Sequence, residues 1–213
     1  WPAMGRIVDS LPTGPNLTKS KTMNSYFVRK NFLPDDLCDD MIQRFEKDSH
    51  LHYAGTIGGG RVDLNVKNCV ELHLTNANGW EDIDKRLCDY TNQAINDYHE
   101  FVSRQIKSTG SILGSDLNDP GYKIKRYSNS DCYFHWHHDM HCENDQVRIA
   151  TILWYLNDVD EGGETEFNDG RIIKPERGKM LIFPATWSFI HRGKPPISGP
   201  KYLLSTFIYG KMQ

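Results

Sequence analysis

One short segment of the sequence gathers residue types that bind metal ions. Residues 132–141 read CYFHWHHDMH, with four histidines and one aspartate. Side chains two residues apart on a β-strand point to the same face, so His137 and Asp139 would project together, as would His135 and His137. Two imidazoles and one carboxylate form the ligand set that suits non-haem Fe(II) with coordination positions left open. The segment therefore predicts a metal site that needs a further histidine from elsewhere.

The missing histidine should lie far away in sequence, on a neighbouring strand. The candidates are His50, His52, His73, His99 and His191. His99 falls within an amphipathic helical pattern, and His50 and His52 flank the end of a predicted helix, where histidines are commonly capping or surface groups. His191 lies late in a β-rich part of the chain, where antiparallel pairing would bring it opposite residues 137–139.

The elements that must position these residues follow from hydrophobic periodicity. Residues 33–50 and 78–106 carry apolar side chains at helical spacing and predict two helices, and residues 25–32 and 61–74 predict extended structure with a turn at Asn68. From Gly121 onward, short alternating or β-branched segments are separated by turn signals. Many short strands at this spacing predict a sandwich or barrel-like double sheet, and the whole chain an α+β domain.

Composition narrows the class of protein. The 213 residues are 38% hydrophobic and 25% charged, with a formal net charge of −3, which is ordinary for a globular protein and gives no general attraction to nucleic acid or membranes. No apolar run reaches the length of a membrane span, and the N-terminal residues lack the apolar centre of a signal peptide. Five cysteines without a CxxC pair favour reduced thiols and a cytoplasmic location.

Several sequence elements of the β-rich half occur together in a recognisable order. The chain from about residue 121 to 210 resembles the prolyl 4-hydroxylase-like branch of the Fe(II)- and 2-oxoglutarate-dependent dioxygenases, and looks most similar to its compact microbial or viral members. The elements that carry the resemblance are Tyr127, His137 with Asp139, YLN (155–157), EGGETEF (161–167), FPA (183–185), His191 and SGPKY (198–202).

The resemblance implies which residues hold iron. The family pattern places an aromatic residue three positions before a His-x-Asp pair, and Phe134 stands three before His137. It thereby implies His137, Asp139 and His191 as the iron ligands and catalytic centre. The other three histidines of residues 132–141 are then expected to be exposed or to lie near the mouth of the site, with His135 as the remaining competitor because it shares a face with His137.

The resemblance also implies a binding site for 2-oxoglutarate. A basic residue is expected about ten positions after the distal histidine, and Lys201 stands there. A carboxylate that ends in the interior must be paired with a charge. Lys201 would provide it, and the hydroxyls of Tyr127 and Tyr155 would donate to the same carboxylate. The implied cofactors are Fe(II), 2-oxoglutarate as cosubstrate and O₂, with ascorbate as a supporting reductant.

The expected architecture combines the predicted elements with the fold that the resemblance implies. The family fold is a double-stranded β-helix, also called a jelly roll and cupin-like, buttressed by N-terminal helices. We expect a loose arm over residues 1–24 and one domain over 25–213, with helical support at 33–106 and the β-helix core at 121–210. Loops at 50–65, 105–120 and 140–147 would set specificity, and the glycine-rich segment 50–63 is either a mobile lid or a plain connection.

The expected reaction is hydroxylation of an unactivated C–H bond, in first place on a prolyl residue of a peptide or protein, with release of succinate and CO₂. The alternatives are hydroxylation of a free amino acid or other small molecule, and, in a different class, a non-catalytic zinc or cupin-like binding protein. Cys132 and Cys142 would be additional ligands in a zinc protein, although their spacing fits no common finger. The sequence does not define the oligomeric state.

Overall fold

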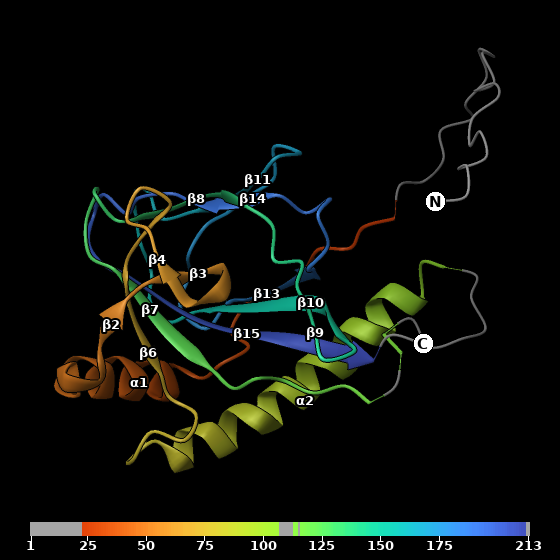
Figure 1. Ribbon diagram of the computed structural model, residues 1–213, viewed down its shortest axis with the longest axis horizontal. Coiled ribbons are helices and arrows are strands. Elements are labelled where there is room, and N and C mark those ends of the chain that lie inside the picture. Colours follow the sequence, from red (N-terminus) through yellow and green to blue (C-terminus); the bar gives the residue numbers. More distant parts are fainter. Residues whose placement is uncertain (1–22, 107–112, 115, 212–213) are drawn as a thin grey trace, which may run out of the picture.

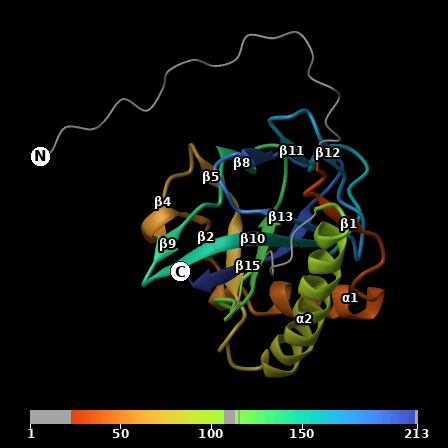
Figure 2. The same ribbon diagram turned by 90° about the vertical axis from the view of Figure 1, so that its right-hand side faces the viewer.

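In the part of the chain that the structure describes, two facing antiparallel sheets and two α-helices form the main layers. The computed structural model describes residues 23–106, 113–114 and 116–211. Figure 1 shows the smaller sheet above, the larger sheet in the middle and both helices beneath it, and Figure 2 shows the same layers from the side. The arm expected over residues 1–24 lies outside the described residues except for its last two positions.

The larger sheet has eight strands, and its strand order places the C-terminal strand at its centre. The order is β1 (Phe27–Arg29), β13 (Met180–Pro184), β10 (Gln146–Tyr155), β15 (Lys201–Lys211), β7 (Lys123–Tyr127), β6 (Val70–His73) and β2 (Tyr53–Ala54), with β9 (Cys142–Glu143) paired to β10.

The smaller sheet has five strands and faces the larger one. Its order is β12 (Ile172–Ile173), β11 (Thr165–Phe167), β14 (His191–Gly193), β8 (Tyr133–His137) and β5 (Lys67–Asn68). A separate two-stranded ribbon joins β3 (Thr56–Ile57) to β4 (Arg61–Val62) through the 3₁₀ turn η2 (Gly58–Gly60), and a second 3₁₀ turn, η1 (Ser49–Leu51), precedes β2.

The two helices bury one apolar stripe each against the outer face of the larger sheet. Helix α1 (Asp35–Lys47) follows Pro34 and opens with two aspartates, which favour a helix N-terminus. Helix α2 (Glu81–Ser103) opens with three acidic residues. Neither described helix is long and apolar enough to cross a membrane. The core that they form with the sheet includes Leu37, Met41, Phe45, Ile83, Leu87, Tyr98, Ile124, Ile152, Trp154 and Leu204.

Alternation along the long strands separates this core from a second one between the sheets. On β10, Ile152 and Trp154 join the helix-facing cluster, whereas Leu153 and Tyr155 join the other. Successive side chains on a strand point to opposite faces, so one buried strand serves both layers. The second cluster is smaller and contains Cys69, Tyr127, Leu153, Tyr155, Phe167, Leu181, Phe183 and Leu203.

The sheets draw on more of the chain than the sequence analysis expected. Strands β5 and β6 lie within residues 33–106, the segment assigned to helical support, yet β6 extends the larger sheet beside β7 and β5 extends the smaller sheet beside β8. Asn68, expected at a turn, lies in β5, and the turn falls at Asp63–Val66, where the Val66 amide donates to the Asp63 carbonyl at 3.0 Å. Alternation in sequence does not reveal which distant strand a short segment will join.

One glycine is required where the chain reaches α1. Gly178 has a φ of 68°, and a Cβ added there would lie 2.4 Å from the carbonyl oxygen of Leu33. The Gly178 carbonyl in turn accepts the amides of Phe32 and Leu33, at 2.7 and 3.1 Å. The turn at 176–178 therefore fastens the segment that leads into α1.

Candidate active site

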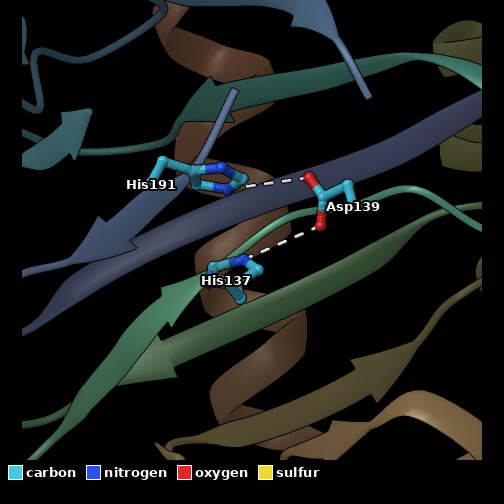
Figure 3. Close-up of side chains that lie close together, drawn as sticks. All are labelled: His137, Asp139 and His191. Carbon is cyan, nitrogen blue, oxygen red and sulfur yellow. Dashed lines mark ion pairs between the residues drawn. The ribbon is translucent and has the colours of Figure 1, made fainter. Parts of the chain in front are cut away.

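Strand pairing brings the distal histidine to the histidine-rich segment. His191 on β14 lies directly opposite His137, the last residue of β8. Asp139 follows two residues later, and its carboxylate lies 3.7 Å from Nε2 of His137 and 3.6 Å from Nε2 of His191. The ligand atoms of the three residues all lie within 4.8 Å of one another, and Figure 3 shows both imidazoles turned toward the carboxylate.

Backbone contacts orient both imidazoles. Nδ1 of His137 lies 2.8 Å from the carbonyl oxygen of His135, and Nδ1 of His191 lies 3.0 Å from that of Phe189. A carbonyl only accepts, so each Nδ1 carries the hydrogen and leaves the Nε2 lone pair directed at the shared centre. This is the usual way in which proteins orient metal-binding histidines.

The protonation states also suit a metal. Burial, with a smaller contribution from His191, lowers the pKa of His137 to about 3, so its imidazole is neutral at neutral pH. Burial alone would raise the pKa of Asp139, but His191, His137 and the hydroxyl of Thr151, which donates to the carboxylate at 2.8 Å, outweigh it and lower the pKa to about 2. The neutral imidazole of His137 and the carboxylate of Asp139 are in the forms that bind a ferrous ion. Among the described residues, these three are the group that could hold a metal ion.

These three residues line a cavity of about 560 Å³ between the sheets. Lys201 lies in the same cavity with none of its surface exposed to solvent. Its Nζ donates to the carbonyl oxygen of Gly163 at 2.9 Å and lies 4.4 Å from the centre of the Tyr127 ring. Burial lowers the pKa of Lys201 to about 7. Gly163, which belongs to the EGGETEF segment (161–167) of the family resemblance, thus anchors this ammonium.

The two predicted tyrosines lie differently. Tyr127 is buried and lines the cavity, and burial raises the pKa of its hydroxyl well above the usual value. Tyr155 is buried too, but it is not among the described residues that line the cavity: its hydroxyl donates to Oγ1 of Thr165 at 2.7 Å. Thr165 does line the cavity, so it, and not Tyr155, presents a hydroxyl there. The sequence analysis did not single out Thr165.

The wall formed by β5, β6 and β7 carries charges that the sequence analysis did not single out. Lys67, Lys123 and Lys125 line the cavity together with Glu71, which is fully buried. Lys67 forms a buried ion pair with Glu71, and Nζ of Lys123 lies 3.8 Å from the same carboxylate. A signal was present in the strand segment KIKRY: alternation puts Lys123 and Lys125 on the face of Tyr127.

The remaining expected residues surround the mouth. His138 and His141 line the cavity, whereas His135 is exposed and does not. Arg148 also lines the cavity, and its guanidinium lies 3.8 Å from the centre of the Phe207 ring. Arg192 instead pairs with Glu166 at 2.7 Å on β11 and does not line the cavity.

Residues 56–60 of the ribbon loop line the cavity as well, and Gly59 and Gly60 have positive φ angles of 72° and 75°. This loop is the part of the segment 50–63 that reaches the site. Cys132 and Cys142, the additional ligands of the zinc alternative, are free thiols outside the group of possible metal ligands.

The two facing sheets, with the site between them, have the jelly-roll architecture. Residues 122–209 match the family model of the 2OG-Fe(II) oxygenase superfamily. This part of the chain is therefore similar to 2OG-Fe(II) oxygenase domains, as the sequence analysis expected, and the curated relatives that the chain matches are named prolyl 4-hydroxylases or probable prolyl 4-hydroxylases.

Among curated relatives, the chain is 25% identical over 214 residues to probable prolyl 4-hydroxylase 8 of Arabidopsis thaliana, a match that covers 83% of this chain and 65% of that protein. It is 29% identical over 136 residues to prolyl 4-hydroxylase 2 of the same plant, which covers 48% of this chain and 45% of that protein. The chain thus spans about two thirds or less of the length of these relatives.

Solved structures confirm the expected double-stranded β-helix. The viral collagen prolyl hydroxylase of Paramecium Bursaria Chlorella virus-1, in its 2OG complex, superimposes with a TM-score of 0.64 at 21% identity, covering 88% of this chain and 97% of that one. A Pseudomonas putida prolyl-4-hydroxylase gives a TM-score of 0.60 at 16% identity, covering 89% and 93%. A prolyl hydroxylase of Trichoplax adhaerens, solved with a hypoxia inducible factor peptide fragment, gives 0.64 at 18% identity, covering 87% and 84%.

Proposed function

We propose that the chain hydroxylates prolyl residues in a peptide or protein, using Fe(II), O₂ and 2-oxoglutarate. The observation that carries the proposal is the convergence of His137, Asp139 and His191 in a cavity that also holds the buried ammonium of Lys201. A metal centre with three protein ligands and a nearby buried cation is what a chelating dicarboxylate cosubstrate requires.

We assign the iron to Nε2 of His137, Nε2 of His191 and the carboxylate of Asp139. Asp139 keeps its orientation through the hydrogen bond from Thr151, and the two imidazoles keep theirs through backbone carbonyls. When bound, iron and 2-oxoglutarate together supply the activation of O₂, with conversion of the cosubstrate to succinate and CO₂.

We assign the distal carboxylate of 2-oxoglutarate to Lys201, with Tyr127 beside it and the hydroxyl of Thr165 as a further donor. The ammonium already donates to Gly163, so it is held in place before the cosubstrate arrives. Tyr155 acts on the cosubstrate indirectly, through Thr165. Because the Tyr155 hydroxyl donates to Oγ1 of Thr165, the hydrogen of the Thr165 hydroxyl is free to be donated into the cavity.

Support for a prolyl substrate comes from the similar proteins, which are named prolyl 4-hydroxylases in Arabidopsis thaliana and Pseudomonas putida and collagen prolyl hydroxylase in a virus. Hydroxylation of a free amino acid or small molecule uses the same iron and cosubstrate and remains the second candidate. We also propose a reducing, cytoplasmic setting, because all five cysteines are free thiols.

The test is a turnover assay with purified protein, Fe(II), 2-oxoglutarate and ascorbate, screened against prolyl peptides and free amino acids. We expect succinate release coupled to the gain of one oxygen atom on proline, detected by mass spectrometry, and no effect of omitting ascorbate on the first turnovers. Coupled turnover on an amino acid alone would favour the second candidate, and absence of Fe(II)-dependent succinate with every substrate would reject an oxygenase function.

A further inference from the structure

A row of lysines runs through the cavity from its closed end towards its opening. Lys201 on β15 lies opposite Tyr127 on β7, the next inward-facing residue of β7 is Lys125, opposite Leu203, and Lys123 follows, opposite Ser205. Exposure rises along this row: Lys201 is 0% exposed, Lys125 is 8% exposed, and the Lys123 side chain is 37% exposed. The last two lysines therefore lie between the cosubstrate end and solvent.

Among the described residues, Lys125 differs from the other lysines of the cavity because its ammonium has neither a hydrogen-bond acceptor nor an ion-pair partner. Lys201 donates to Gly163, Lys67 is paired with Glu71, and Lys123 approaches Glu71. Among the described residues, none accepts a hydrogen bond from the Lys125 ammonium or lies within ion-pair distance of it, although the side chain is more than nine-tenths buried and lines the cavity. A buried ammonium without a partner is costly unless a ligand provides one.

The cosubstrate does not need this second cation. Of the two carboxylates of 2-oxoglutarate, the proposed function assigns one to the metal and the other to Lys201. Glu71 offsets only one of the three lysines on the neighbouring wall. The cavity thus keeps an excess of positive charge, on the wall formed by β6 and β7, after iron and cosubstrate are accounted for.

We propose that Lys125, which lies opposite Glu71 on β6 and next to Lys123 on the same face of β7, binds a carboxylate of the primary substrate. The inference rests on the proposed function and narrows its substrate class: the target proline carries its own free carboxylate, or an acidic residue lies next to it in a peptide. The carboxylate would enter from the mouth, where the ribbon loop of residues 56–60 also lines the cavity.

The experiment is anaerobic titration calorimetry of protein loaded with Fe(II) and 2-oxoglutarate, which reads binding without turnover. One pair of probes consists of blocked prolyl peptides with Asp or Asn beside the proline. A second pair is L-proline and L-prolinamide. Each pair differs by one carboxylate, so the pair that shows a preference identifies the source of the carboxylate.

Wild-type protein should bind the acidic member of one pair about ten- to a hundredfold more tightly than its amide, the range of a charge-assisted hydrogen bond. Lys125→Met should remove this preference and leave binding of the amide unchanged, and Lys125→Arg should retain part of it. Lys85→Met on the exposed face of α2 changes the net charge equally, outside the cavity, and should behave as wild type.

Thermal unfolding of the ligand-free variants distinguishes a ligand-binding lysine from a structural one, because the two roles predict opposite shifts of the unfolding midpoint. Removal of an unpaired buried ammonium should keep or raise the unfolding midpoint in Lys125→Met. A lowered midpoint with unchanged acid preference would make Lys125 a structural partner of Glu71 and overturn the proposal. The proposal would also be overturned if Lys125→Met lost affinity for 2-oxoglutarate and kept its affinity for the substrate. The same holds if wild-type protein showed no preference for the acidic probes.

The outcomes separate this inference from the proposed function. Hydroxylation of proline without acid preference would reject the carboxylate subsite and keep the oxygenase assignment. Binding of acidic probes that depends on Lys125, without hydroxylation of any prolyl compound, would keep the subsite and reject prolyl hydroxylation.

Discussion

Replacement of Lys201 by methionine tests the cosubstrate site most sharply, because the change removes a charge and nearly conserves the volume. Lys201 is fully buried, so the distal carboxylate of 2-oxoglutarate would be left in the interior without a counter-ion. Loss of one member of a buried ion pair costs about 3–5 kcal/mol. The dissociation constant for 2-oxoglutarate should therefore rise by more than about a hundredfold.

The pH dependence of cosubstrate binding gives the same prediction a second readout. Burial lowers the pKa of Lys201 to about 7 in the ligand-free protein. Below this value the ammonium is already present, and above it the amine must take up a proton when the carboxylate binds. Affinity for 2-oxoglutarate should thus fall as the pH rises above 7, by up to about tenfold per pH unit. Lys201→Met should lose this dependence.

The assay is calorimetric titration of 2-oxoglutarate into Fe(II)-loaded, anaerobic protein across this pH range. Lys179→Met is the matched control, because Lys179 is also a buried lysine but donates to the carbonyl of Lys174 and does not line the cavity. We expect normal cosubstrate affinity in this control if it folds. Unchanged affinity and unchanged pH dependence in Lys201→Met would refute the assignment of Lys201 to the cosubstrate.

Three further predictions concern the surroundings of the site. Thr165→Val should raise the 2-oxoglutarate concentration needed for half-maximal succinate release by about tenfold, since it removes one hydroxyl donor, and it should lower the unfolding midpoint because Tyr155 loses its acceptor. Glu71→Gln should lower the free energy of unfolding by about 3 kcal/mol in denaturant titrations, because Lys67 loses its buried partner. An unchanged free energy of unfolding would show that this ion pair does not stabilise the fold. Gly178→Ala should lower the unfolding midpoint, since its φ is positive and its Cβ would meet the carbonyl of Leu33, and a midpoint equal to wild type would show that the turn adapts.

Much of the fold was accessible from sequence because its signals are local. The apolar stripe of α2 and the alternation in β10 each report burial over a continuous segment. The assignment of β5 and β6 to the two sheets was not accessible, because short strands take their partners from residues far along the chain, such as those of β7 and β8.

The same contrast between local signals and long-range pairing applies to the site. The spacing of His137 and Asp139 indicated a metal site, and the place of His191 in the β-rich part made it a candidate third ligand. The family resemblance was needed to assign it, since the sequence does not show which strands pair across more than fifty residues. That Thr165 lines the cavity, and not Tyr155 as expected, has a similar cause. Both residues point between the sheets, and the packing of facing sheets decides which hydroxyl reaches the open space.

The most direct test of the central claim is the amount of Fe(II) bound per chain, measured by anaerobic equilibrium dialysis and metal analysis. We predict one tightly bound ion in wild-type protein, loss of that ion in His137→Ala, Asp139→Ala and His191→Ala, and its retention in His135→Ala, whose side chain is exposed and outside the cavity. Retention of stoichiometric iron in Asp139→Ala and His191→Ala, with loss in His135→Ala, would contradict the account.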